Sequence, residues 1–232
     1  MVTTLGRTLD DHVRDDPRAL QVYLKARAAY DEHRLPHHNF LHIVRDLHRA
    51  LLIADAEPAV EYQVLIPAVL LHDIGFFTPD YKEAGHDVTG ARLAREWLFE
   101  FSYGSEQIEA ICHCIRAHKG KAETPRSLEA RILYDADVLE KAGAVYLILA
   151  GRVTCEFDET IEHFLAREVG DRAKESSRGY YTTMGRKLDN GRLERTRLLL
   201  DDVHAEIQTE RSDIRLDESA LWADSPPRVE NH

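Results

Sequence analysis

The apolar run Val64–Leu71 constrains the fold of this chain more than any other segment. Its eight residues are far fewer than the roughly 20 that cross a bilayer, so we expect the buried half of a central helix over about 58–73. Gly75 is expected to stop this helix. The run leads into His72 and Asp73, and a buried carboxylate is costly unless it is paired or bound to a metal. The pair therefore predicts a site at the end of the helix.

Helical periodicity continues along most of the chain. Asn39 can cap a helix whose apolar residues recur every three or four positions, and Ser105 can cap another. Thr124-Pro125 is typical of a helix start, here of a helix expected to reach Leu149. No alternating strand pattern and no internal repeat is visible, so we predict one all-α, single-domain helical bundle. Further helices are expected at 85–101, 158–167 and 193–208.

The composition is that of a globular protein, with 232 residues, of which 44% are hydrophobic and 31% charged. A formal net charge of −11 argues against broad nucleic-acid binding, which depends on phosphate neutralisation, but it allows a small phosphorylated substrate. Three cysteines are too few for a disulfide framework, and no secretory signal is visible. We therefore expect a cytoplasmic protein that binds neither nucleic acid nor membrane and that can form a homo-oligomer.

Three regions are expected along the chain. Residues 1–25 form an N-terminal helical extension, and residues 26–215 form the main domain, with the motif region at 30–151. Residues 216–232, which include a Ser-Pro-Pro stretch, are expected to be a flexible tail.

Histidines are unusually frequent, 13 in all, and several stand in patterned positions. His38 and His42 are one helical turn apart, so both can face the same way. An adjacent His and Asp, as in His72-Asp73, supply a mixed nitrogen and oxygen ligand set suited to a divalent ion. Each of these patterns is weak alone, and together they predict a metal site.

The set of motifs resembles the HD superfamily of metal-dependent phosphohydrolases, over roughly Tyr30 to Gly151. The segment 37–42 also resembles the Tyr-His-Asn-x-x-His pattern of several HD families, with His37 in place of tyrosine. Cyclic-nucleotide phosphodiesterases have a histidine three residues after the HD pair, and Phe76 stands there instead. The residues that correspond to the defining HD pattern are His42, His72, Asp73 and Asp137.

The resemblance implies a helical bundle of the HD type with divalent metal ions, expected to be two, drawn from Fe, Mn, Co, Ni, Zn or Mg. His86 and His118 would complete the ligand set of the second ion. Asp73 would bridge both ions and help to hold the attacking water. His38 would act as general acid. The implied reaction is hydrolysis of a phosphate ester or anhydride in a small metabolite, with a nucleotide as the first candidate.

Two ligand positions have competitors nearby. Asp135 and Asp137 are about 200° apart around a helix, so both cannot face one metal centre, and periodicity does not choose between them. His113 and His118 point in directions about 140° apart around a helix, so they also compete for one position. The family pattern favours Asp137 and His118.

Cations near the motifs are candidates for binding an anionic substrate, although charged residues beside a site are common and Lys141 can equally form a helical pair with Asp137. Two other functions stay open. Some HD proteins with six such ligands are di-iron oxygenases that cleave C–C or C–P bonds with O₂, and a non-catalytic binding module could keep the ligands. The substrate-binding candidates are Arg34, Lys119 and Lys141.

Overall fold

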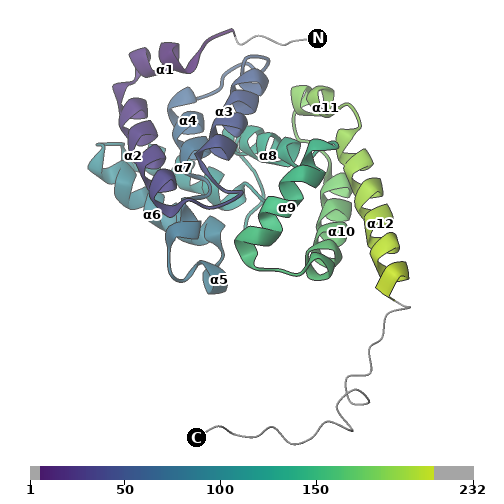
Figure 1. The fold of residues 1–232 in the computed structure, drawn as a ribbon. Coiled ribbons are helices and arrows are strands. Elements are labelled where there is room, and N and C mark those ends of the chain that lie inside the picture. Colours follow the sequence, from purple (N-terminus) through teal and green to yellow (C-terminus); the bar gives the residue numbers. More distant parts are fainter. Residues whose placement is uncertain (1–5, 212–232) are drawn as a thin grey trace, which may run out of the picture.

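The computed structural model describes residues 6–211, so the expected tail at 216–232 lies outside the described residues. The described part is all-α, as predicted, and contains no strand (Figure 1). No helix in it is both long and apolar enough to cross a membrane. The elements are α1 Leu9–Asp15, α2 Pro17–His33, α3 Phe40–Ala54, α4 Tyr62–Leu71, the 3-10 helix η1 Ile74–Phe77, α5 Tyr81–Ala84, α6 His86–Glu100, α7 Ser105–Ala117, α8 Leu128–Glu140, α9 Val145–Phe157, α10 Ile161–Arg178, α11 Thr183–Asp189 and α12 Arg192–Arg211.

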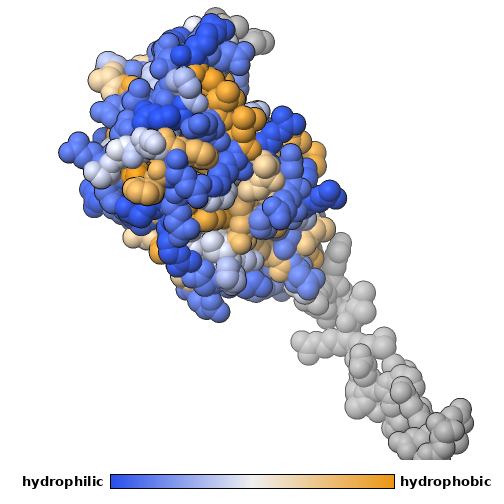
Figure 2. Space-filling view, turned by 90° about the vertical axis from the view of Figure 1, so that its left-hand side faces the viewer, coloured by the Kyte–Doolittle hydropathy of each residue, from blue (hydrophilic) through white to orange (hydrophobic). Residues whose placement is uncertain are grey.

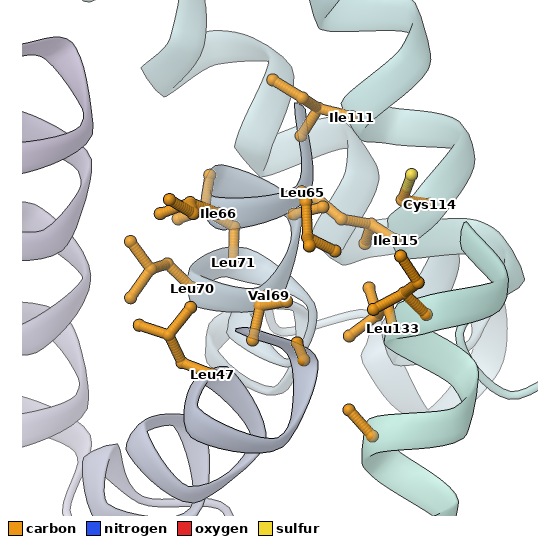
Figure 3. Packing of buried hydrophobic residues seen from close by; sticks show 14 of the residues in the cluster. Leu47, Leu65, Ile66, Val69, Leu70, Leu71, Ile111, Cys114, Ile115 and Leu133 are labelled. Carbon is orange, nitrogen blue, oxygen red and sulfur yellow. The ribbon is translucent and has the colours of Figure 1, made fainter. Parts of the chain in front are cut away.

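The apolar run forms the centre of the molecule. Every residue of Val64–Leu71 is buried, and α4 is surrounded by α2, α3, α7 and α8. Figure 3 shows Leu65 beside Ile115 of α7, with Leu133 of α8 close by. Helix α4 begins at Tyr62, later than the expected start near 58. A helix buried on all sides must be apolar all round, which explains the unbroken run.

Two cap assignments from the sequence were wrong. Ser105 is the first residue of α7 rather than its cap, and α8 is capped by Ser127, not by Thr124. The helix expected to continue to Leu149 is also divided in two. Gly143 has φ +94° between α8 and α9, and its N–H donates to the side-chain oxygen of Thr196 at 2.6 Å. A contact with a distant helix therefore fixes this break.

Gly75 is required for a different reason from the one expected. It lies inside η1 with no left-handed backbone, and a Cβ on it would stand 1.9 Å from the carbonyl oxygen of His86. Only a glycine lets η1 approach the start of α6 so closely. This approach brings His86 opposite the end of α4.

The helices form two units around two hydrophobic cores. The core layer consists of α1 to α8, η1 and α11. All of these except α5, together with Leu193 of α12, contribute residues to one large hydrophobic core or pack against it. Helix α2 crosses the expected boundary at residue 25 and packs into this core through Val22, Ala26 and Tyr30. The C-terminal cap consists of α9, α10 and α12 around a smaller core of its own. On the face seen in Figure 2 the surface is mainly hydrophilic, with hydrophobic residues between the polar ones.

Candidate metal centre

Two histidines stand at the ends of core helices. His72 follows the last residue of α4, and His118 follows the last residue of α7. In each, Nδ1 is bonded to the main-chain carbonyl three residues earlier, at 2.8 Å from Val69 O and 2.6 Å from Ile115 O. Because a carbonyl can only accept, each contact favours a proton on Nδ1. This leaves Nε2 of both buried imidazoles as the nitrogen that can bind a metal.

The carboxylate of Asp73 lies among four imidazoles. Its Oδ2 is 3.2 Å from Nε2 of His42 and 3.2 Å from Nε2 of His72. Its Oδ1 is 3.4 Å from Nε2 of His86 and 3.6 Å from Nε2 of His118. Each oxygen faces a different pair of rings, which is the arrangement of a carboxylate that can bridge two ions.

The candidate ligands gather in two buried groups, and within each group the ligand atoms lie within 4.8 Å of one another. All six metal ligands expected from the sequence are among them. Asp46, one turn after His42 on α3, is an additional member that the sequence reasoning missed, although its spacing of four from His42 was a usable signal. The first group is His42, Asp46, His72 and Asp137, and the second is Asp73, His86 and His118.

Buried polar atoms that lack a hydrogen-bond partner indicate whether a cation fits among these residues. Among the described residues, Nε2 of His42, Nε2 of His72 and Oδ2 of Asp46 are buried without a hydrogen-bond partner. Burial lowers the pKa of His42, but Asp46 and Asp73 outweigh it and hold this pKa well above its ordinary value. The carboxylates therefore stabilise positive charge at this place, and the donor set fits a divalent transition metal.

The imidazoles of the second group are neutral, as ligands must be. Burial and the neighbouring His72 lower the pKa of His118 to about 4. Burial and Lys119 hold the pKa of His86 well below its ordinary value. The ring of His86 also stacks on Phe76 at a centroid distance of 4.0 Å, which fixes its plane.

The two competing ligands face elsewhere. Asp135 accepts hydrogen bonds from the backbone N–H groups of Tyr181 and Thr182, at 2.9 and 2.8 Å, and thereby attaches α11 to α8. His113 contacts Glu123, with 3.0 Å between Nδ1 and Oε1. Neither belongs to the two ligand groups.

A cavity of about 80 Å³ adjoins both groups, with the core layer on one side and α9 and α10 on the other. Lys141 lines it but is ion-paired, with Nζ 2.8 Å from Asp137 and 3.5 Å from Glu175. Lys119 also lines it; its main-chain carbonyl accepts a hydrogen bond from Arg178 at 3.2 Å, but its ammonium has no hydrogen bond or ion pair within the described part of the chain. Arg34 is exposed at the end of α2 and is not among the lining residues, so the structure does not bring it to the site.

His38 is held by a residue that the sequence reasoning missed. Its Nδ1 is bonded to Oε1 of Glu156 in α9, and Oε2 of Glu156 accepts the backbone N–H groups of His37 and His38 at 2.7 and 3.0 Å. Burial raises the pKa of Glu156, but the hydrogen bond from His38 outweighs it and lowers this pKa below its ordinary value. No spacing could reveal a pair 118 positions apart.

Known proteins are similar to parts of this chain in sequence and to its fold. The family model of the HD domain matches residues 32–142. Ribonuclease Y of Acidothermus cellulolyticus is 34% identical over 52% of this chain and 22% of its own length. The 3′-5′ exoribonuclease YhaM of Bacillus subtilis is 32% identical over 45% of this chain and 40% of its own length. The chain thus spans less than half the length of these relatives.

Solved structures extend the likeness beyond the matched segment. A predicted HD superfamily hydrolase from an uncultured Thermotogales bacterium is 26% identical, with a TM-score of 0.54 over 81% of this chain and 91% of its own. Bacillus subtilis YpgQ in complex with ADP is 23% identical, with a TM-score of 0.55 over 85% and 95%, and shares the fold. The family model includes every residue of the two ligand groups, from His42 to Asp137. Residues 32–142 of the chain are therefore an HD domain, the domain of a superfamily of hydrolases.

Proposed function

We propose that this protein hydrolyses a phosphate ester or anhydride of a small metabolite, with a nucleotide as the first candidate. The observation that carries the proposal is Lys119, a half-buried residue in the cavity beside both ligand groups, whose ammonium has no hydrogen-bond or ion-pair partner among residues 6–211. Burial lowers its pKa, and Lys141 and Lys121 lower it further, so an anion at this place would be stabilised. A phosphoryl oxygen supplies that charge.

The cavity volume supports a small reacting group. About 80 Å³ is well below the roughly 300 Å³ of pockets that enclose a whole ligand. It is a few times the volume of a water molecule, about 30 Å³, which suits a phosphoryl group. The remainder of the substrate would then extend past the rim, or α9 and α10 would move to admit it.

The ligand groups fit two divalent ions, which would polarise the phosphoryl group and lower the pKa of a nearby water. Asp73 would join the two sites through its two oxygens, and Lys119 would bind a phosphoryl oxygen. His38 would donate a proton from Nε2 to the leaving oxygen as the P–O bond breaks. Glu156 would orient this ring through Nδ1. Phe76, whose ring centroid is 4.3 Å from that of His38, would keep water from this side.

Phosphate release from a panel of nucleotides and other phosphorylated metabolites, with Mn²⁺, Co²⁺ or Mg²⁺ added, tests the proposal. RNA oligonucleotides belong in the panel, because the relatives named above are ribonucleases, which does not agree with the expectation that nucleic acid is excluded. Phosphate release without O₂ consumption supports the proposal. O₂ uptake coupled to C–C or C–P cleavage, with no hydrolysis, would overturn it in favour of the oxygenase alternative.

Substitution of two lysines that line the cavity tests the role proposed for Lys119. Lys119→Met should raise KM for the anionic substrate by about 10- to 100-fold, because a hydrogen bond to a charged group contributes roughly 1.5–3 kcal/mol. Lys121→Met is the control, since Lys121 also lines the cavity but is half exposed and paired with Asp171 at 2.9 Å. Equal effects of the two substitutions would contradict the role given to Lys119.

A further inference from the structure

Asp46 is the member of the ligand groups that neither the HD pattern nor the sequence reasoning supplied. Its side chain is fully buried in α3. Its Oδ1 accepts a hydrogen bond from Arg49 at 2.6 Å, which fixes the carboxylate plane. Its Oδ2 is buried and has no hydrogen-bond partner in the part of the chain that the structure describes. A carboxylate with one oxygen anchored and the other left free is costly unless a cation completes it.

The free oxygen lies on the metal-binding side of the neighbouring imidazoles. Oδ2 of Asp46 is 3.3 Å from Nε2 of His42 and 3.8 Å from Nε2 of His72. Oδ2 of Asp73 approaches the same two nitrogens at 3.2 Å each. Asp46 therefore stands where a ligand of the same ion would stand.

An outer carboxylate that only orients a ligating histidine lies on the opposite side, at the ring nitrogen that does not bind the metal. Glu140 has this position, with Oε1 3.5 Å from Nδ1 of His42. Glu140 is also fixed by Arg45, through Oε1 at 2.8 Å from Nε, and by Arg49. The two buried carboxylates beside His42 thus face different nitrogens of one ring.

We infer that Asp46 is a direct metal ligand, bound through Oδ2 to the ion held by His42, His72 and Asp137. The inference rests on the proposed metal centre but not on the reaction it performs. With the shared Asp73, five side chains then surround this ion. That exceeds the four ligands of a tetrahedral zinc site and, with three carboxylates present, favours an ion of higher coordination number such as Mn²⁺ or Fe²⁺.

Metal binding by two isosteric variants tests the inference without an activity assay. We would titrate the metal-free protein with Mn²⁺ and follow free Mn²⁺ by electron paramagnetic resonance. Asp46→Asn should lower the affinity for Mn²⁺ at the His42, His72 and Asp137 site by more than about a hundredfold. Glu140→Gln should lower this affinity by only the roughly 10- to 100-fold typical of an outer partner. Similar losses in both variants, or no loss in Asp46→Asn, would overturn the assignment.

The unmodified protein gives a second test that does not depend on how a variant folds. A crystal structure of the Mn²⁺-loaded protein should place Oδ2 of Asp46 about 2.0–2.3 Å from the ion, the usual range for a carboxylate ligand. A water molecule between Asp46 and the ion would overturn the assignment. If Mn²⁺ binds as expected and no phosphate ester is hydrolysed, the proposed function fails while the assignment of Asp46 stands.

Discussion

The core layer and the C-terminal cap meet the same cavity with different kinds of residue. From the core layer come the imidazoles and carboxylates of both ligand groups, fixed on α3, α4, α6, α7 and α8. From α9 and α10 come Tyr146, Phe157 and a set of paired charges that includes Arg172 and Glu175. The ligand side is embedded in one continuous hydrophobic core, whereas the cap rests on a separate and smaller one.

This difference separates two tasks. Ligands must be held in place whether or not substrate is present, and a close-packed core does that. The surface on the other side of the cavity must allow entry, and a unit with its own small core can open locally while the ligand side stays packed. The pairs of Lys141 with Asp137 and with Glu175 of α10 link the two units. The four predictions that follow challenge this division, from the largest expected effect to the smallest.

Asp73→Asn, in the core layer, should have the greatest effect on activity. It removes the charge that faces all four imidazoles, and metal ions contribute several kcal/mol to such reactions, so kcat should fall by about a thousandfold. Metal analysis of the purified variant should show loss of both ions. Retention of two ions with unchanged kcat would show that Asp73 does not join the sites.

Substitution of one leucine in each hydrophobic core compares how the two cores contribute to stability. Leu65 of α4 and Leu165 of α10 are both at most 2% exposed. Leu65→Ala should lower the free energy of unfolding of the whole protein by about 2–5 kcal/mol. Leu165→Ala should instead open the cap first, seen as faster amide hydrogen exchange in α9, α10 and α12 with Mn²⁺ binding unchanged. Weakened Mn²⁺ binding in Leu165→Ala would mean that the two units do not act separately.

Glu156 is the contact that couples the cap to the proposed acid. Glu156→Ala should slow hydrolysis of alkyl phosphates by about 10- to 100-fold, because a poor leaving group needs a proton, and general acids contribute roughly 10²–10⁴-fold. Esters of p-nitrophenol, a good leaving group, should be affected much less. Glu156→Gln is the control that keeps a hydrogen-bond acceptor for the two backbone N–H groups. Equal losses for both ester types would indicate a purely structural role.

Arg34→Ala should have the smallest effect. The side chain is exposed at the end of α2 and does not line the cavity, so KM and kcat should stay unchanged and stability should move by no more than about 0.5 kcal/mol. Steady-state kinetics beside a thermal melt would check this. A marked rise in KM would restore the role expected from the sequence.

Local signals in the sequence predicted much of the core layer. The unbroken apolar run predicted the central helix, and the resemblance to the HD pattern predicted six residues of the two ligand groups. The cap resisted prediction because its structure depends on distant partners. The break at Gly143 is fixed by Thr196, and Glu156 reaches His38 across 118 positions. Sequence periodicity carries no information on such pairs. Proximity along the chain is also a poor guide, because Arg34 is exposed and does not line the cavity.

The bonds from Nδ1 of His72 and His118 to the carbonyls of Val69 and Ile115 have a consequence for how the protein acquires metal. Each histidine completes the end of its own helix, so the rings are oriented by folding rather than by the ion. Loading should then be reversible, without refolding, and nearly as fast as access through the cavity allows. A cell could exchange one metal for another in the mature protein according to supply, and the ion that is found on purification would report on the growth medium.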